Sequence, residues 1–450
     1  MSATLQNAQS SLAAVVGASR VITDAAACAA LSVDGKFPQC IVYPTTAEEV
    51  AAILRCAAQH DLGVIPCRNG TKLGVGNPPR RFDVALSLKD MNRVWHYEAA
   101  DLTITAEPGM KFGDFQHFVS RDGLWLPLDP PGGSRASLGG IVATNACGPL
   151  RLTYGAPRDM VLGMKIATGE GKVVKAGGRV VKNVAGYDIG KLLIGSYGTL
   201  GVIVETSFKL FPLPRRRATF AIAVGTLGIG RDLRRRIQKS PLAPARMVLM
   251  NAGGVRMAAA NPPGREAKEP EIWLEMAGSK RVIERCEREL AELGKESAVV
   301  PRSVESAEAE AAWARLTDLR TCLPELSAEA IILKATLPDS ASEELISRAE
   351  QEAEGEKAKL AAVAQLGVGI VLLSVLSQHA APTMVSMIRR LRDAAQALGG
   401  ALVVERCPLE IKTELDVWGA PGNDFELMRK LKALWDPKGI LAPGRFLGWL

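Results

Sequence analysis

Glycine-rich segments between residues 66 and 205 constrain this chain more than any other feature. The stretch GGRVVKNVAGYDIGKLLIGSYGTLGVIVE (177–205) holds seven glycines between short apolar runs. Two earlier segments, PCRNGTKLG (66–74) and LDPPGGSRASLGGIVATNACGPLRLTYG (128–155), have the same character. Glycine lets a backbone adopt positive φ or approach a ligand more closely than a Cβ would allow. The segments therefore indicate either a bulky anionic ligand or a set of tight turns in a sheet.

The motifs and polar residues of these segments indicate the type of ligand. None of them matches a P-loop or a G-x-G-x-x-G turn. In the first segment, successive amides are a candidate nest for phosphate oxygens, with Arg68 or Lys72 close by. The second segment adds Ser137, Thr144 and Asn145 as neutral donors. Together the three segments predict one large nucleotide cofactor held by several backbone loops.

Length and composition indicate a globular protein of two or three domains. Its 450 residues exceed one ordinary core, and 47% hydrophobic with 23% charged residues argue against a disordered or fibrous chain. A net charge of +7 suits an anionic ligand. The basic runs at 215–217 and 234–236 have no interleaved aromatic residues, so nucleic-acid binding is not expected.

Targeting and redox signals favour the cytoplasm. The N-terminal sequence lacks the basic start and dense apolar core of a secretory signal. The longest apolar stretch, around 368–373, is too short to cross a bilayer, so no integral membrane segment is expected. Eight cysteines are scattered without a C-x-x-C pair, which is typical of reduced thiols rather than of a disulfide frame, zinc ribbon or iron–sulfur cluster.

The first large block covers residues 40–212. It is rich in glycine and β-branched residues, and runs such as DVALSL, LTITAEPG and LGVIVETSFKL indicate an α+β block with many strands. A helix is predicted between 45 and 63, with Thr45 or Thr46 as its N-cap and Gly63 at its end. Pro212 and Pro214, followed by three arginines, mark a boundary.

Residues 213–410 are predicted to form a second α+β unit. Charged helical stretches at 279–296 and 339–365 alternate with the strand-like runs EIWLEMAG, AIILKATLP, GIVLLSVL and GALVVERCP. No repeat of fixed period is visible. Residues 1–39 form an N-terminal segment, and residues 411–450 form a helix and a docked C-terminal tail.

Four motifs in order resemble one known family. PCRNGTKLG, PPGGSRASLGGIVATNACGPLRLTYG, GYDIGKLLIGSYGTLGVIVE and the terminal DPKGILAPGRF are similar to the FAD-binding fold shared by vanillyl-alcohol oxidase and p-cresol methylhydroxylase. Within that fold the chain resembles the FAD-binding E subunits of bacterial glycolate oxidases. The resemblance implies an α+β fold with a two-part FAD-binding domain and a second, ferredoxin-like α+β cap domain.

The resemblance implies that the first two glycine-rich loops cradle the FAD pyrophosphate, while the third walls the flavin and adenine. It carries the cofactor role onto Arg68, Asn69, Gly70, Thr71, Lys72, Pro131, Gly132, Gly133, Ser137, Gly139, Gly140, Thr144, Asn145, Gly148, Tyr154, Gly155, Val202, Val204 and Arg445.

Departures from the family pattern are informative. Thr71 stands where covalent relatives often place a flavin-linking His, so the FAD is expected to be non-covalent. Ala442 replaces the usual Asn of the tail, while Pro443-Gly444-Arg445 is kept. The dehydrogenase subunits carry an E-H-G-I-G metal segment, whereas the matching region here is VVERCPLEIK, and the four histidines form no ligand cluster. No metal site is therefore expected.

A substrate site is implied in the second unit. The segment WARLTDLRTCLPELSAEAIILKATLP (313–338) resembles the family segment in which an Arg and a Lys bind a hydroxy-acid carboxylate. Arg320 and Lys334 stand at nearly that spacing. A 2-hydroxy acid needs a fixed cation to orient it, and Arg supplies a bidentate fork. The alternative is a surface Arg and a strand-end Lys.

The resemblance implies an FAD-binding subunit of a glycolate oxidase type complex. Such a subunit oxidises a small 2-hydroxy acid, glycolate or D-lactate, by hydride transfer to FAD. The expected partners are a larger flavoprotein subunit and an iron–sulfur subunit, in the cytoplasm or peripheral to the inner membrane. Two alternatives stay open: a catalytically silent FAD-carrying electron-transfer or scaffold subunit, and a self-sufficient FAD-dependent 2-hydroxy-acid dehydrogenase.

Overall fold

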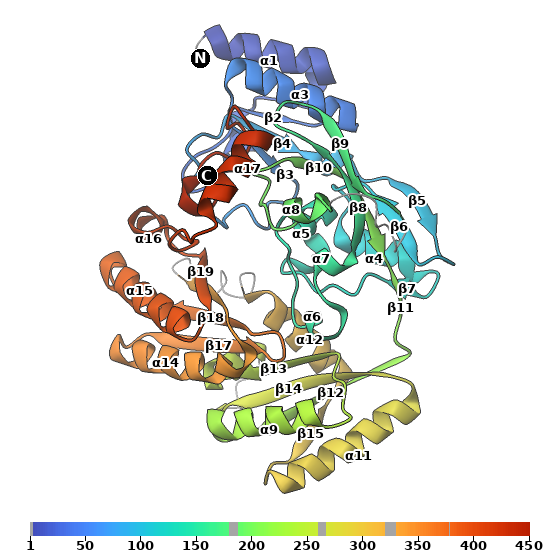
Figure 1. Ribbon diagram of the computed structural model, residues 1–450, viewed down its shortest axis with the longest axis vertical. Helices are drawn as coiled ribbons and strands as arrows, with labels where there is room; N and C mark the ends of the chain where they lie inside the picture. Colours follow the sequence, from blue (N-terminus) through green and yellow to red (C-terminus); the bar gives the residue numbers. More distant parts are fainter. Residues whose placement is uncertain (1–2, 180–187, 260–266, 320–329, 378) are drawn as a thin grey trace.

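The computed structural model describes residues 3–179, 188–259, 267–319, 330–377 and 379–450. Figure 1 shows two lobes, the upper one built from the first part of the chain and the C-terminal helix, and the lower one around a large sheet. We call them the first lobe (residues 3–212 and 411–450) and the second lobe (213–410). Both chain ends lie in the first lobe.

The first sheet of the first lobe has the strand order β1-β2-β4-β3. Its elements and the helices around them are α1 (Ala3–Val16), β1 (Val21–Ile22), α2 (Ala25–Ala29), β2 (Cys40–Val42), α3 (Ala47–His60), β3 (Val64–Cys67) and β4 (Val84–Ser87). Strands β2, β4 and β3 run parallel, and α1 packs against α3. The C-terminal tail joins this sheet through a bridge between Val64 and Leu441.

Helix α3 begins where the sequence indicates, but it ends earlier. The Thr46 side chain accepts a hydrogen bond from the Glu49 amide at 3.1 Å, which is the N-cap geometry. The helix ends at His60 because Asp61 adopts the left-handed conformation and closes the last turn. Gly63 has another role: a Cβ there would lie 2.9 Å from the Cβ of Arg81, so it allows two segments to cross closely.

The second sheet is antiparallel, with the order β5-β6-β10-β8-β9. Its strands are β5 (Val94–Glu98), β6 (Thr103–Ala106), β8 (Val161–Ala167), β9 (Val173–Gly177) and β10 (Val202–Lys209), and β7 (Leu124–Trp125) pairs separately with β11 (Phe211–Pro212). The helices nearby are α4 (Phe112–Ser120), α5 (Leu138–Ala143), α6 (Arg151–Tyr154), α7 (Pro157–Met160) and α8 (Gly190–Leu193). Phe115 of α4 meets Phe208 of β10 edge to face in the buried core.

The second lobe is one sheet of eight antiparallel strands in the order β15-β12-β14-β13-β17-β18-β16-β19. The strands are β12 (Arg216–Ala223), β13 (Arg246–Met250), β14 (Glu271–Gly278), β15 (Pro301–Val304), β16 (Ile331–Thr336), β17 (Lys359–Gln365), β18 (Ile370–Leu376) and β19 (Ala401–Arg406). The helices are α9 (Leu227–Lys239), α10 (Ala252–Ala258), α11 (Lys280–Glu296), α12 (Ser306–Thr317), α14 (Ser342–Gly355) and α15 (Ala381–Ala397), and the tail adds α16 (Leu409–Glu414) and α17 (Phe425–Trp435).

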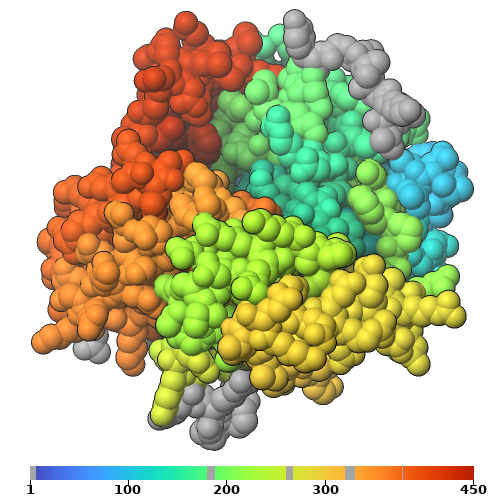
Figure 2. Space-filling model, turned by 60° about the horizontal axis from the view of Figure 1, so that its bottom comes forward, coloured from blue at the N-terminus to red at the C-terminus, as the bar shows by residue number. Residues whose placement is uncertain are grey.

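This sheet consists of two equivalent halves. The first half contains, in chain order, β12, α9, β13, β14, α11 and β15. Its strands lie in the ferredoxin-like order β15-β12-β14-β13. In the second half β16, α14, β17, β18, α15 and β19 give the same arrangement, and the halves join where β13 pairs with β17. Figure 2 shows the yellow-green and yellow surface of the first half beside the orange surface of the second. The ferredoxin-like prediction is confirmed, but the repeat is invisible in sequence because the halves share topology rather than residues.

One predicted helix is partly wrong. The stretch 339–365 was expected to be helical throughout, yet α14 ends at Gly355 and residues Lys359–Gln365 form β17. The alanines of this segment favour a helix when taken alone. In the fold they pair with β18 on one side and with β13 on the other, and Ala362, Ala364 and Val363 are fully buried. Tertiary pairing therefore overrides local propensity.

Both faces of the sheet are covered. Helices α9, α11, α14 and α15 cover the outer face, and α10 and α12 cover the face towards the first lobe. Trp313 of α12 is 2% exposed, lies edge to face with Trp273 at 6.3 Å, and donates its indole N–H to Thr219 at 3.0 Å. Trp313 therefore fixes α12 on the sheet.

We expect Trp313→Ala to lower the free energy of unfolding by about 3–5 kcal/mol, because a large buried ring and its hydrogen bond are lost together. Thermal and chemical unfolding measure the change. Trp95→Ala is the control, since that ring is 54% exposed. An equal, small effect of both substitutions would contradict this role of Trp313.

Candidate functional site

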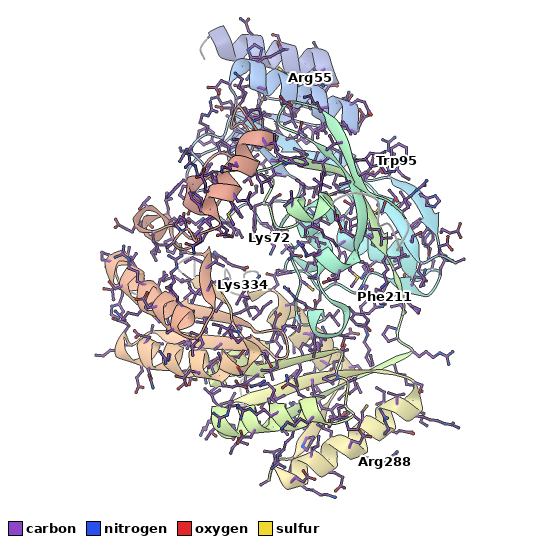
Figure 3. The ribbon with its side chains drawn as sticks, in the orientation of Figure 1. Arg55, Lys72, Trp95, Phe211, Arg288 and Lys334 are labelled. Atoms are coloured by element: carbon purple, nitrogen blue, oxygen red, sulfur yellow. The ribbon has the colours of Figure 1, made fainter. Side chains whose placement is uncertain are left out.

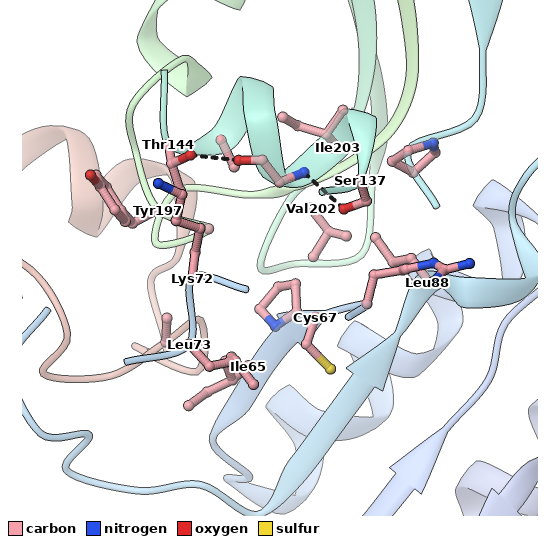
Figure 4. A pocket seen from close by; sticks show the side chains of 18 of the residues that line it. Ile65, Cys67, Lys72, Leu73, Leu88, Ser137, Thr144, Tyr197, Val202 and Ile203 are labelled. Atoms are coloured by element: carbon pink, nitrogen blue, oxygen red, sulfur yellow. Dashed lines mark hydrogen bonds between the residues drawn. The ribbon is translucent and has the colours of Figure 1, made fainter. Parts of the chain in front are cut away.

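A cavity of about 930 Å³ lies in the first lobe between the two sheets. Figure 4 shows its walls, which come from β3 and the loop after it, from α5, from the segment leading into β10, and from the C-terminal tail. We call it the cofactor cavity. Ile65, Leu88, Val202 and Ile203 give it apolar surface, and the loop after β3 gives it polar backbone.

The loop after β3 needs glycine at two positions. Gly70 has φ 70° and Gly76 has φ 104°, values that other residues adopt only with strain. A Cβ on Gly76 would also lie 2.6 Å from the carbonyl oxygen of Arg445. Glycine therefore lets this loop pass directly against the tail.

Arg445 fixes the shape of the same loop. Its guanidinium donates to the carbonyl oxygens of Val75 at 2.5 Å and Asn77 at 2.8 Å, and also to that of Leu73. The side chain is 6% exposed. Burial lowers the pKa of Arg445 to about 10, and the carboxylate of Asp34 opposes this shift. The tail therefore holds the loop through a buried cation.

Asp34 is the counter-charge of two buried cations. Its carboxylate accepts from the Lys412 ammonium at 2.8 and 3.0 Å and from Arg445 at 3.3 Å. Lys412 is 3% exposed in its side chain and also donates to the carbonyl oxygen of Gly74 at 2.7 Å. We call Asp34, Lys412 and Arg445 the loop clamp. It joins the N-terminal segment, α16 and the tail to one loop of the cofactor cavity.

Helix α5 forms the opposite wall. Ser137 is its N-cap, with its hydroxyl accepting from the Gly140 amide at 3.3 Å, and Thr144 donates to the Gly140 carbonyl oxygen at 2.7 Å (Figure 4). A Cβ on Gly139 would lie 2.6 Å from the Cβ of Pro108. Gly139 is therefore required for close packing on Pro108, a reason that differs from the ligand contact expected from sequence.

The structure brings many of the predicted cofactor residues to this cavity. Those that line it are Arg68, Asn69, Gly70, Thr71, Lys72, Ser137, Gly139, Gly140, Thr144, Val202 and Arg445.

Other predicted cofactor residues do not line the cavity. Val204 is 2% exposed in the core beneath the first sheet, and Tyr154 stacks edge to face between Trp125 and Phe211. The Gly148 amide donates to Asp129, and Gly155 turns the chain with φ 86°. These residues support the cofactor cavity from behind its walls rather than lining it.

The remaining predicted residues lie between the cofactor cavity and the second lobe. Pro131 faces the second lobe, and the amide of Gly132 donates to Asp318 at 2.5 Å. Gly133 follows with φ 51°. Asn145, with φ 47°, has a buried Oδ1 without a hydrogen-bond partner.

Sequence reasoning missed several residues of the site. Asp34 and Lys412 lie outside every glycine-rich segment, so no local pattern marks them. Tyr197 lines the cavity with φ 55° and packs on Trp418 at 4.7 Å between ring centroids. The only signal for Tyr197 was its place in the third glycine-rich segment.

A second, smaller cavity lies between the lobes. We call it the interlobe cavity. Lys334 of β16 reaches it, 3.9 Å from the Glu405 carboxylate of β19. Figure 3 labels Lys72 in the first lobe and Lys334 in the second, on the two sides of the boundary between the lobes. Arg320, the predicted partner of Lys334, lies outside the described residues.

Ionisable groups of both lobes meet beside this cavity. Burial raises the pKa of Asp129 to about 6, and the Arg246 guanidinium and the amides of Leu150 and Gly148 oppose the rise. Burial also raises the pKa of the Cys147 thiol well above its usual range. Arg246 lies over the ring of Trp313 at 4.2 Å. The lobes are therefore joined by buried charges rather than by apolar contacts alone.

The described residues contain neither a cluster of metal ligands nor a membrane-spanning helix. Within those ranges, no three His, Cys, Asp or Glu side chains are grouped as metal ligands. Nor does any helix there have the length and apolar character needed to cross a membrane.

Comparison with known proteins identifies the family. The FAD binding domain pattern matches residues 38–177, and the pattern of the FAD linked oxidases, C-terminal domain, matches residues 213–446. The chain belongs to the FAD-linked oxidases. The predicted fold, the FAD cofactor and the oxidoreductase class are thereby confirmed.

Relatives of this FAD-linked oxidase include two glycolate oxidase subunits. GlcD of Bacillus subtilis is 25% identical over 420 residues, covering 91% of this chain and 88% of the relative. GlcE of Escherichia coli is 46% identical over 121 residues, which is 27% of this chain and 35% of the relative. The crystal structure of p-cresol methylhydroxylase with substrate bound has a TM-score of 0.78 at 17% identity, covering 99% of this chain and 97% of that one, so the fold is shared.

The chemistry of the cofactor cavity fits FAD. Gly70, Gly140, Gly198 and Gly201 lie along the walls. Cationic Arg68 and Lys72 suit a pyrophosphate, and the apolar side chains suit flat rings.

The Asp129 pKa gives a pH-dependent stability. Because the pKa is raised above the unfolded value of 3.8 to about 6, the folded state binds the proton more tightly. Protonated Asp129 therefore adds about 3 kcal/mol to the free energy of unfolding below about pH 4. This stabilisation is lost as the pH rises through 6. We expect Asp129→Asn to flatten the dependence of the unfolding midpoint on pH in this window. Asp101→Asn, at an exposed site, is the control, and equal pH profiles for wild type and Asp129→Asn would refute the assignment.

Proposed function

We propose that FAD lies non-covalently in the cofactor cavity. The pyrophosphate is held between two elements. One is the loop after β3, with Arg68 and Lys72, and the other is the N-terminus of α5 at Ser137. Support comes from the family match and from the glycines along the walls. Thr71 lines the cavity and offers no imidazole for attachment to the flavin. Asn145, with its orphaned buried Oδ1, is a further candidate contact.

The reaction we propose is oxidation of a small 2-hydroxy acid, with glycolate as the first candidate and D-lactate as the second. When bound, FAD accepts the hydride from the carbon that bears the hydroxyl. Lys334 holds the substrate carboxylate in the interlobe cavity, and Arg320 is carried over as its partner from the resemblance. The observation that carries this proposal is a partly buried lysine at the polar end of a small cavity beside the cofactor cavity.

A subunit role is proposed from the GlcE likeness. That relative is named as one subunit of a glycolate oxidase. We infer a larger flavoprotein and an iron–sulfur subunit as partners, which carry electrons onward. Seven cysteines of the described chain are free, which suits the reducing cytoplasm. Attachment to the inner membrane would then occur through partners.

A silent FAD-carrying subunit is the second candidate function. The observation that favours it is the Lys334–Glu405 ion pair, since a carboxylate already lies beside the cation that would bind substrate. The two candidates differ in one measurable property: the first reduces its own flavin with substrate, and the second does not.

We expect purified protein to carry FAD that is released by acid or heat into the supernatant. Without oxygen, glycolate or D-lactate should bleach the flavin absorbance, because hydride transfer needs no partner subunit. Flavin retained in the pellet would contradict non-covalent binding. Unbleached flavin with either acid would favour the silent subunit.

We expect Asp34→Asn to weaken FAD binding by about tenfold or more. Removing one partner of a buried ion pair costs about 3–5 kcal/mol, and part of that is expressed in the loop that lines the cavity. Titration of apoprotein with FAD measures the dissociation constant. Glu170→Gln is the control, because it breaks an ion pair to Lys172 whose side chains are 48% and 71% exposed. An unchanged FAD affinity in Asp34→Asn would exclude a role of the loop clamp in cofactor binding.

A further inference from the structure

The interlobe cavity has a polar end and an apolar side. Ile332, Ile370 and Leu372 form the apolar side, and Lys334 and Glu405 form the polar end. The side chain of Lys334 is 30% exposed and that of Glu405 is 13% exposed. A small acid with one charged group and a short carbon chain suits such a space.

Gln365 indicates that a polar ligand belongs in this cavity. It lies at the end of β17, lines the cavity and is only 2% exposed. Its Oε1 is buried and has no hydrogen-bond partner. Buried side-chain polar atoms are nearly always paired, so an orphaned amide oxygen facing a cavity calls for a hydrogen-bond donor inside that cavity. This observation is independent of the charges on Lys334 and Glu405.

The interlobe cavity adjoins the cofactor cavity. Thr71 and Thr144 line the cofactor cavity, whereas Pro131 and Cys147 line the interlobe cavity. Gly132 follows Pro131 in the chain and packs on Thr71, because a Cβ on Gly132 would lie 3.3 Å from the Cβ of Thr71. Gly132 therefore links the walls of the two cavities, which are in contact at residues 131 and 132.

Oxidation of an alcohol needs an acceptor for the hydroxyl proton. The four histidines of the chain, His60, His96, His117 and His379, line neither of these two cavities. Cys147 is a poor acceptor because its thiol is buried beside the Asp129 carboxylate. Among the described residues that line the interlobe cavity, Glu405 is the one carboxylate.

We propose that Glu405 is the proton acceptor for the 2-hydroxy acid that Lys334 binds. The inference rests on the proposed function and adds a catalytic residue to it. The substrate O–H bond breaks and its proton moves to a Glu405 carboxylate oxygen. The C–H bond breaks with its electron pair going to FAD, and a C=O bond forms, so the products are a 2-oxo acid and reduced FAD.

The Lys334–Glu405 ion pair makes the proton transfer depend on bound substrate. In the free protein Glu405 lies 3.9 Å from the Lys334 ammonium. An arriving carboxylate competes for the same ammonium and adds a negative charge beside Glu405. The Lys334 ammonium is therefore shared between Glu405 and the substrate carboxylate only when substrate is present.

The test compares Glu405→Gln with wild type in the FAD-loaded protein. Flavin bleaching by glycolate without oxygen should slow by about a hundredfold or more, the usual contribution of general base catalysis. Oxalate, a non-oxidisable acid, should bind about three- to tenfold more tightly, because Lys334 loses its competing carboxylate. Binding is read from the change in flavin absorbance. Opposite effects on binding and bleaching are not expected from structural damage.

Three further variants make the result decisive. Glu414→Gln, on the exposed face of α16, should leave both readouts unchanged. Lys334→Met should weaken oxalate binding by about ten- to a hundredfold. Glu405→Asp keeps a carboxylate, so its flavin should bleach faster than that of Glu405→Gln. This variant also tests the role of the carboxylate if Glu405→Gln folds poorly.

The outcomes separate this inference from the proposed function. Bleaching by Glu405→Gln within threefold of wild type, or weaker oxalate binding, overturns the role of Glu405 and leaves hydroxy-acid oxidation standing. Wild-type flavin that no 2-hydroxy acid bleaches overturns the proposed reaction, and the proton transfer with it. Slow bleaching with tight oxalate binding in Glu405→Gln supports both.

Discussion

The buried carboxylate of Asp34 is the interaction on which the shape of the cofactor cavity depends. It neutralises Lys412 and Arg445, which together bind carbonyl oxygens of Leu73, Gly74, Val75 and Asn77. Two cations without a counter-charge could not remain buried at low cost. Residues 34, 412 and 445 are far apart in sequence, so the loop has its final shape only after the whole chain has folded. The matched FAD binding domain begins at residue 38, so one member of the loop clamp lies before it.

The same reliance on buried polar contacts appears between the lobes. Asp318 accepts from the Gly132 amide, and Arg246 lies 4.0 Å from Asp129 while pairing with Glu275 at 2.7 Å. These contacts fix the second lobe to the segment that separates the two cavities. The position of Lys334 relative to the cofactor cavity thus depends on charges that are not part of either cavity. Substitutions at these charges would disturb the site without touching a ligand.

Much of the fold and part of the site could be predicted from sequence. The strands at 84–87, 202–209 and 271–278 follow apolar runs bounded by turn residues, and the cap at Thr46 follows helix-start chemistry. The glycine-rich segments marked the cofactor cavity because backbone exposure leaves a compositional trace. Asp34 left no such trace, since a lone acid in a turn looks like any surface residue until its partners are known. β17 was missed because its alanines carry no strand preference, and only pairing on both sides decides its conformation.

The ferredoxin-like halves of the second lobe have the same connectivity but different tasks. The first half holds Arg246 and carries Trp313 of α12 against its strands, and the second half holds Lys334, Gln365 and Glu405, which line the interlobe cavity. A fold unit that occurs twice in one sheet thus allows a division of labour between a half that anchors the lobe and a half that lines the cavity. Residues at the interlobe cavity can be replaced in the second half while the first half keeps the lobe in place. Within one continuous sheet, the lobe can diversify chemically without losing its attachment.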